Sequence, residues 1–420
     1  MTSNLLKLAK RHRRTAAQAA MVLLRLGNAG AKFALTIYMA RYLGLADVGA
    51  YGLIVGLVTG LPVILSFGIH DWTSRLVVGL DRSAAIPIAT TRLATTFAIE
   101  LAVQALLWAG AMWFGPPIGA TTAMLIAAIL LLEHLSLDAF SLQIGRGQAV
   151  AANILFFIRS GLWPLIAILW GLIDPGARSL DTVLLCWVGG LSLSWIAIAI
   201  LAVTRGWWRF AGFDRDYLRR AFVGGVPFWI ADIGVVGNLY LDRFLVSYFL
   251  GMEAVGIYTF FWSYTNVVHT LAVNGIMLPQ MPALVSAART GDTALIGKER
   301  RRIALETARW GIGLALAAGL VMPALLPLMG RPILAASLPV FALIMLGTLA
   351  RMTSEGLGFV LISQHRDQAI ATTAIGAVIA SAALNSALIP LLGLYGAAAA
   401  YVMVGLGLTL ARRRIAAKAD

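Results

Sequence analysis

Apolar residues occur along this chain in runs of about 20, and short breaks of glycine, proline and charged residues separate the runs. A run of about 20 residues is long enough to cross a bilayer as a helix. Within lipid, a helix satisfies every backbone N–H and C=O internally. The pattern predicts twelve membrane-spanning helices, over residues 16–41, 48–70, 84–107, 117–141, 148–172, 182–204, 220–247, 255–280, 303–328, 335–361, 368–391 and 394–411.

Composition supports an all-α integral membrane protein. Of the 420 residues, 60% are hydrophobic and only 12% are charged, and the mean hydropathy is +0.85. A water-soluble domain of this size needs far more polar residues to cover its surface. The single cysteine, Cys186, lies inside an apolar run. We therefore expect no disulfide framework and interpret Cys186 as a small core residue.

Lysine and arginine distinguish the two sides of the predicted bundle. Of 33 such residues, 23 fall in the two terminal segments and in alternate connections. Only four are assigned to the opposite side: Arg41, Arg178, Arg243 and Arg331. Because basic residues accumulate on the cytoplasmic side, both termini are predicted to be cytoplasmic. The net charge of +14 then faces the cytosol and its anionic lipids, and no nucleic-acid partner is needed to explain it.

A short sequence occurs twice. Residues 42–51 read YLGLADVGAY and residues 249–258 read FLGMEAVGIY, an offset of 207. Each copy forms the predicted outer turn between the first two helices of a six-helix set. Six crossings separate the copies, so the repeat is parallel, with a pseudo-two-fold axis along the membrane normal. The predicted organisation has six-helix lobes at 15–204 and 220–411, a cytoplasmic linker at 205–219, and basic cytoplasmic tails at 1–14 and 412–420.

Four motifs carry a resemblance to a known family: ARYLGLADVGAYGL, LDRFLVSYFLGMEAVGIYTF, MLPQMPALVS and LIPLLGLYGAAAAYV. With twelve spans, the chain resembles the polysaccharide-unit (lipid-linked oligosaccharide) flippases. They belong to the MOP exporter superfamily, which also contains the MATE multidrug exporters and the lipid II flippases. Lipid II flippases typically carry two further spans, and their absence here favours the polysaccharide branch.

The resemblance implies a V-shaped, MATE-like bundle that works by alternating access. Its implied substrates are glycans linked to undecaprenyl diphosphate, moved from the inner to the outer leaflet of the bacterial inner membrane. It also implies membrane lipids as partners, together with the polymerase or export machinery of surface polysaccharide biosynthesis.

The first predicted helix carries a polar stripe. Gln18, Arg25 and Lys32 are spaced by seven residues, and Asn28 and Thr36 fall on the same face. Charges inside a membrane are costly unless they face a cavity or a partner. We interpret Arg25, Asn28 and Lys32 as a cationic cavity wall that receives a lipid diphosphate. Alternatively, Arg25 extends to the cytosol and Lys32 pairs with a carboxylate on a neighbouring helix.

The repeat adds a hypothesis about gating. An offset of 207 maps Arg25 onto Asp232 in the seventh helix. Symmetry-related positions face each other across a two-fold cavity, so these side chains are candidates for an interlobe ion pair that forms in one state. Simple packing between lobes is the alternative.

Three polar or aromatic residues share one face of the eighth predicted helix. Trp262, Asn266 and His269 are spaced i, i+4 and i+7. Trp262 and Asn266 are candidate sugar contacts, and His269 is a candidate gating or coupling residue because histidine titrates near neutral pH. Buried packing with a satisfied histidine explains the pattern equally well.

Three further charges are candidates for the cavity or for ion pairs inside a lobe. Arg351 and Glu355 lie at i and i+4, where they are placed to neutralise each other. Otherwise Arg351 lines the cavity and Glu355 takes part in gating or coupling. Arg159 is a further candidate for the cationic wall, or for a network with acidic residues of the N-terminal lobe.

Several motifs are missing from the sequence. It contains no GxxxxGK[ST] phosphate loop and no Cys/His cluster with metal-site spacing. We expect no cofactor, no metal and no enzymatic activity. Two alternatives remain. A MATE-like antiporter of drugs or organic cations would need an acidic cavity. A membrane enzyme of glycan assembly would need a catalytic site in an outer loop, and the predicted outer loops are short.

Overall fold

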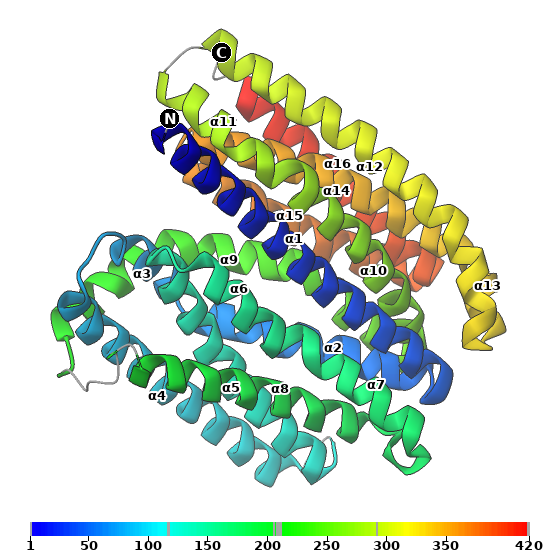
Figure 1. The fold of residues 1–420 in the computed structure, drawn as a ribbon. Helices are drawn as coiled ribbons and strands as arrows, with labels where there is room; N and C mark the ends of the chain where they lie inside the picture. The colour runs from blue at the N-terminus through cyan, green and yellow to red at the C-terminus, as the bar shows by residue number, and fades with distance from the viewer. Residues whose placement is uncertain (1, 116–117, 205, 207–211, 291–292, 418–420) are drawn as a thin grey trace.

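The computed structural model describes residues 2–115, 118–204, 206, 212–290 and 293–417. Throughout these residues the regular structure is helical (Figure 1). Twelve of the described helical segments are long and apolar enough to cross a membrane, as the hydropathy pattern predicts. The helices form two groups, one from each half of the chain, which meet along α1, α2, α9 and α10.

The N-terminal half forms the first group. Its helical elements are α1 (Thr2–Tyr42), α2 (Leu45–Leu65), α3 (Ile69–Leu76), α4 (Arg82–Phe114), α5 (Ala120–Gly145), α6 (Ala149–Phe157), the π-helical turn η1 (Ile158–Leu162), α7 (Trp163–Ile173), the 3-10 turn η2 (Pro175–Ala177) and α8 (Leu180–Thr204). The fifth span is continuous through α6, η1 and α7.

The C-terminal half forms the second group. Its helical elements are α9 (Arg215–Leu250), α10 (Met252–Ala272), the π-helical turn η3 (Val273–Met277), α11 (Leu278–Thr290), α12 (Thr293–Met329), α13 (Pro332–Ala336), α14 (Leu338–Ser363), α15 (Asp367–Leu392) and α16 (Leu394–Ala417). The eighth span is continuous through α10, η3 and α11.

The two copies of the repeated sequence pack against each other. Gly44 and Gly251 begin α2 and α10 with positive φ angles of 127° and 81°, a conformation that favours glycine. A Cβ atom on Gly49 would clash with the carbonyl oxygen of Met252, and one on Gly256 would clash with that of Leu45. The two turns thus approach backbone to backbone, which explains why both copies keep glycine.

At the end of the bundle that carries the repeated turns, two arginines form hydrogen bonds between the two groups of helices. Arg41, at the end of α1, donates to the carbonyl oxygen of Leu328 at 3.1 Å. Arg331, just before α13, donates to the carbonyl oxygen of Ala40, also at 3.1 Å. Each bond joins one group of helices to the other. The two carbonyl oxygens are available as acceptors because carbonyls near helix C-termini lack intrahelical partners.

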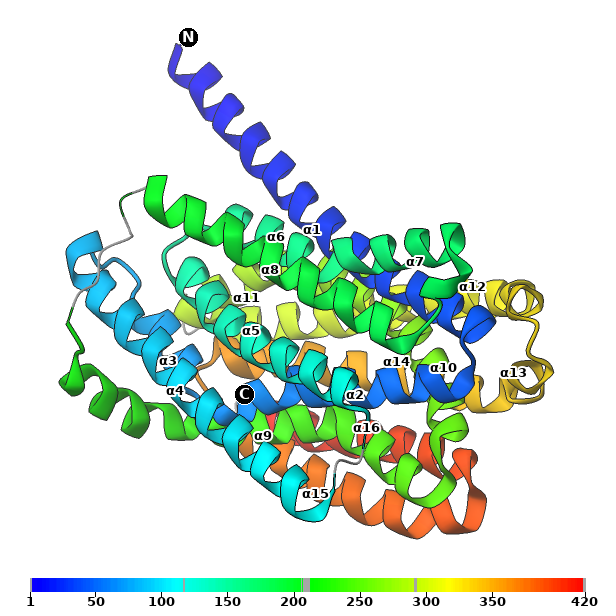
Figure 2. The same ribbon diagram turned by 90° about the horizontal axis from the view of Figure 1, so that it is seen from below.

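The predicted terminal tails continue the adjacent helices. Figure 2 shows the N-terminal part of α1 projecting beyond the bundle. At the other end, α16 includes residues 412–417. Arg412 is buried and donates to the carbonyl oxygen of Ser354 at 3.0 Å, so this residue belongs to the helical group and not to a free tail. Much of the predicted linker, 205 and 207–211, lies outside the described residues.

Candidate functional site

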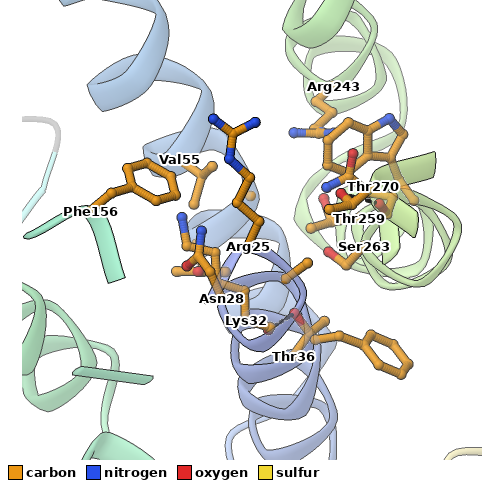
Figure 3. A pocket seen from close by; sticks show the side chains of 16 residues that line it. Arg25, Asn28, Lys32, Thr36, Val55, Phe156, Arg243, Thr259, Ser263 and Thr270 are labelled. Carbon is orange, nitrogen blue, oxygen red and sulfur yellow. Dashed lines mark hydrogen bonds between the residues drawn. The ribbon is translucent and has the colours of Figure 1, made fainter. Parts of the chain in front are cut away.

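A cavity of about 260 Å³ lies between the two groups of helices. Residues of α1, α2 and α6 line it from the N-terminal half, and residues of α9 and α10 line it from the C-terminal half (Figure 3). Because both halves contribute to the walls, a relative motion of the halves would change the cavity. The polar and aromatic lining residues include Arg25, Asn28, Lys32, Thr36, Arg243, Thr259, Trp262, Ser263, Asn266 and Thr270.

The polar stripe of α1 faces this cavity. Arg25, Asn28, Lys32 and Thr36 all line it (Figure 3). The Thr36 hydroxyl donates a hydrogen bond to the carbonyl oxygen of Lys32, one turn earlier in the helix, at 2.9 Å. Threonine side chains within helices commonly make this bond. These four residues of the stripe therefore form part of the cavity wall. The described side chains do not include that of Gln18.

Arg25 bridges the two halves through neutral partners. Its Nε donates to Asn153 Oδ1 at 3.0 Å, and its Nη1 donates to Asn274 Oδ1 at 3.0 Å. Asn153 belongs to α6 and Asn274 to η3. Both acceptors are amides, so the hydrogen bonds orient the guanidinium without neutralising its charge. Arg25 does not pair with Asp232 in this conformation.

Arg243 is a cavity cation that the sequence reasoning missed. The lysine and arginine tally counts it among the residues of the outer side, but it lies inside α9, 1% exposed, and lines the cavity. Its Cζ is 3.9 Å from the ring centroid of Trp262, and its buried Nε and Nη2 have no hydrogen-bond partner among the described residues. The repeat contained the necessary signal, because the 207 offset maps Thr36 of the polar stripe onto Arg243.

The carboxylate of Asp242, the residue before Arg243, accepts hydrogen bonds from groups other than the Arg243 guanidinium. Asp242 Oδ2 accepts from the Tyr258 hydroxyl at 2.7 Å, and its Oδ1 accepts from the backbone N–H of Arg243 at 2.8 Å. Asp242 does not line the cavity. Among the described lining residues there are three cations, Arg25, Lys32 and Arg243, and no carboxylate.

The predicted sugar contacts both line the cavity, whereas His269 does not. Trp262 and Asn266 stand on the α10 wall. One turn further along, His269 Nε2 lies 2.7 Å from Glu355 Oε2. Of the three residues predicted to share one helical face, Trp262 and Asn266 thus line the cavity, and His269 contacts the neighbouring helix α14.

Arg351 and Glu355 form an ion pair, as their spacing predicted. Arg351 Nε lies 2.9 Å from Glu355 Oε1, and the second carboxylate oxygen contacts His269. Arg351 is not among the residues that line the cavity. The structure therefore places Arg351 in a His269–Glu355–Arg351 contact between α10 and α14, and not in the cationic wall.

Arg159 is likewise placed outside the cavity wall. Its Nη2 lies 3.5 Å from Glu133 Oε2, and its guanidinium packs over the ring of Phe156, with Cζ 5.3 Å from the centroid. Glu133 also accepts from the indole of Trp187 at 3.1 Å. Phe156 lines the cavity and Arg159 is not among the lining residues, so Arg159 is a packing and pairing residue here.

Asp232 contacts the neighbouring half at another point. It lies beside His70 and Asp71 of α3, with one nitrogen or carboxylate oxygen from each of the three residues within 4.8 Å of the others. This cluster, here called the seam cluster, is at the contact between α3 and α9 and not in the cavity.

The chain has the fold of a class of membrane transporters. It resembles the structure described as the inward-facing conformation of a multidrug resistance MATE family transporter of the MOP superfamily, with a TM-score of 0.75 and 13% identity over 95% of this chain and 98% of the other. The outward-facing conformation gives a TM-score of 0.65 at 13% identity, covering 96% of each chain. This chain is therefore a multi-pass membrane protein with the MATE transporter fold.

Another similar structure differs from these in its described pocket. It is a MOP superfamily transporter from Pyrococcus furiosus Vc1, with a TM-score of 0.59 and 11% identity over 96% of each chain. Its description states that the binding pocket has reverse polarity and suggests a different function. No curated protein matches this chain.

The sequence family is more specific than the fold. Residues 18–287 match the family described as polysaccharide biosynthesis protein. The chain belongs to that family. The match confirms the resemblance carried by the turn motifs, and it includes both copies of the repeated sequence.

Proposed function

We propose that this protein flips oligosaccharide or polysaccharide repeat units linked to a lipid diphosphate from the inner to the outer leaflet of the bacterial inner membrane. Both termini would be cytoplasmic, and the product would serve surface polysaccharide biosynthesis. The observation that carries the proposal is the interlobe cavity with Arg25, Lys32 and Arg243 on its walls and no carboxylate among its described lining residues.

The charge of this cavity suits a diphosphate. Two opposite unit charges 4 Å apart attract by about 4 kcal/mol at an effective dielectric constant of about 20. The arginines supply forked N–H donors that match phosphate oxygens, and Lys32 supplies a compact point charge. The unpartnered Nε and Nη2 of Arg243 are donors that a phosphate oxygen would satisfy.

The rest of the lining suits a sugar next to the diphosphate. Trp262 offers an aromatic face, although the Arg243 guanidinium covers one side of its ring in this conformation. Asn266, Ser263 and Thr270 add amide and hydroxyl groups from the same helix. The cavity volume of about 260 Å³ is at the low end for ligand sites. It would accommodate the diphosphate and the first sugar, while the lipid chain and further sugars occupy space outside it.

The same features weigh against the two alternatives. An antiporter of organic cations needs negative charge where the substrate binds, and this cavity presents positive charge. The reverse polarity described for the Pyrococcus furiosus transporter indicates that pocket polarity varies within this fold. An enzyme of glycan assembly would need convergent titratable groups in an outer site, and the cavity residues do not provide an acid–base pair.

A reconstitution experiment tests the proposal. Purified protein in vesicles is given a fluorescent oligosaccharide linked to a polyprenyl diphosphate, and loss of fluorescence to an impermeant quencher reports flipping. We expect flipping of the diphosphate lipid and none of a matched neutral glycolipid. Export of an organic cation dye, with no movement of the diphosphate lipid, would favour the antiporter instead.

A further inference from the structure

The seam cluster brings titratable groups from both halves of the chain together. His70 and Asp71 come from α3, which follows the second span, and Asp232 comes from α9. One nitrogen or carboxylate oxygen from each residue lies within 4.8 Å of the other two. His70 is 7% exposed. The cluster is outside the cavity, and the proposed substrate contacts do not use it.

Hydrogen bonds determine which nitrogen of His70 carries the proton. Ser66 Oγ lies 2.7 Å from His70 Nδ1. The same oxygen accepts from Arg92 Nη2 at 3.0 Å and from the backbone N–H of His70 at 3.3 Å. With both lone pairs used, Ser66 must donate its own hydrogen to Nδ1. Neutral His70 therefore carries its proton on Nε2, the nitrogen that lies 3.6 Å from Asp71 Oδ1.

The carboxylates of the cluster are incompletely satisfied. Asp232 Oδ2 is buried and has no hydrogen-bond partner among the described residues. Asp71 and Asp232 approach each other from opposite halves, and two ionised carboxylates at this separation repel. An additional proton on the cluster would replace this repulsion with attraction between an imidazolium and a carboxylate, or with a shared hydrogen bond.

We propose that His70, Asp71 and Asp232 form a proton-binding site that holds the two halves together at the α3–α9 contact when occupied and weakens that contact when empty. The site ties proton binding to the arrangement of the halves, whatever the substrate. It adds a candidate coupling ion to the proposed function without depending on it.

The surrounding charges set the pH range. Burial lowers the pKa of His70 from its ordinary value of 6.5, and Arg92 and His134 act in the same direction, while Asp71 and Asp138 act against them. From α9, the Tyr217 hydroxyl contacts Thr73 and not the cluster. Burial opposes the imidazolium, whereas the two facing carboxylates favour an added proton, so the cluster takes up its proton as the pH falls. The contact is therefore held at acid pH and weakened as the pH rises.

Distance measurements on the full chain test this proposal. Spin labels are attached at Ala84→Cys on α4 and Thr372→Cys on α15, both exposed, in a Cys186→Ser background, and the protein is reconstituted in vesicles. Between about pH 5 and pH 8, we expect the distance distribution to shift toward longer values as the pH rises. The shift should disappear in Asp232→Asn. An unchanged shift in that variant would overturn the proposal.

Matched variants separate the cluster from its surroundings. Asp367→Asn removes an exposed carboxylate at the start of α15 that lies 3.5 Å from Arg75 of α3, another charged contact between the two halves, and it should retain the pH-dependent shift. Asp71→Asn changes a side chain that is 47% exposed; it provides the test if Asp232→Asn fails to insert. A shift produced at fixed pH by Mn²⁺ and reversed by chelator would identify a metal and reject the proton. None of these readouts requires transport.

Discussion

At the scale of single residues, the membrane cations divide according to their partners. Charged groups within a bilayer are retained when they pair or face a polar cavity. Arg351 pairs with Glu355, and Arg92 pairs with Asp138 at 2.7 Å, fully buried. Arg25 and Arg243 instead meet amides, an aromatic ring and the cavity. The partner, and not the residue type, distinguishes structural cations from candidate substrate cations.

The first prediction concerns the three cations that line the cavity. Arg25→Ala, Lys32→Ala and Arg243→Ala should each lower flipping of a lipid diphosphate by at least about tenfold, because a hydrogen bond to a charged group contributes about 1.5–3 kcal/mol. Flipping in vesicles is the measurement, normalised to protein inserted. Arg309→Ala is the control, since Arg309 is exposed on α12 within a span. Wild-type flipping rates in all three cavity variants would show that these cations do not contribute to transport.

The second prediction concerns the ion pair that the structure separates from the cavity. Glu355→Gln leaves the Arg351 charge uncompensated and removes the carboxylate partner of His269. We expect the free energy of unfolding to fall by about 3 kcal/mol, measured by thermal unfolding in detergent. The double variant Arg351→Met with Glu355→Leu should recover much of this loss. A single variant as stable as wild type would show that the pair has no structural role.

At the scale of helices, the repeated turn is a packing device. Gly49 and Gly256 bring the starts of α2 and α10 into backbone contact. Small residues allow such close approach between membrane helices, where packing replaces the hydrophobic effect as the driving force. The repeat therefore marks where the two halves touch, which accounts for its preservation in both copies.

The third prediction follows from that contact. Gly256→Ala places a Cβ atom against the carbonyl oxygen of Leu45, so α10 or α2 must move to relieve the clash. Overpacking of this kind costs about 1–3 kcal/mol, and thermal unfolding should show the loss. Gly376→Ala in α15 meets nothing within 4 Å and should be neutral or slightly stabilising. Equal stability of both variants would contradict a tight contact at the repeat.

At the scale of the whole molecule, the distribution of basic residues predicts the orientation of the bundle in the membrane. The end of the bundle that carries the repeated turns has few lysines and arginines. Arg41 and Arg331 of that end are used to join the two halves. Most basic residues of the termini and of the other connections belong to the opposite side in the sequence analysis, and the positive-inside rule predicts that this side is cytoplasmic.

The fourth prediction tests this orientation in cells. In a Cys186→Ser background, Val78→Cys, 65% exposed, lies on the side predicted to be cytoplasmic. Ser179→Cys, exposed in the connection between α7 and α8, lies on the opposite side. An impermeant thiol reagent added to intact spheroplasts should label Ser179→Cys and spare Val78→Cys. The reverse labelling would invert the topology and with it the proposed direction of flipping.

Local patterns predicted much of the site but misplaced some of its members. The seven-residue spacing of Arg25 and Lys32 identified a helical face, and that face does line the cavity. Arg159 and Arg351 matched the same chemical description, yet each pairs with a carboxylate, Arg159 with Glu133 of α5 and Arg351 with Glu355 of its own helix. Arg243 lies within the predicted span 220–247 but was counted with the outer-side basic residues, because its position near the span's end did not reveal that it faces a cavity. The repeat offset would have placed it on the polar stripe.

The sequence by itself determined the number of spans, their parallel duplication and the family, because these depend on periodicity and on residues near one another in the chain. The tertiary structure alone decided which charges and polar groups meet between helices. The contacts of Arg25 with Asn274, of His269 with Glu355, and of Asp232 with the seam cluster join residues far apart in sequence. In a low-dielectric bundle the free energy of a charge depends on its spatial neighbours, and only packing specifies those neighbours.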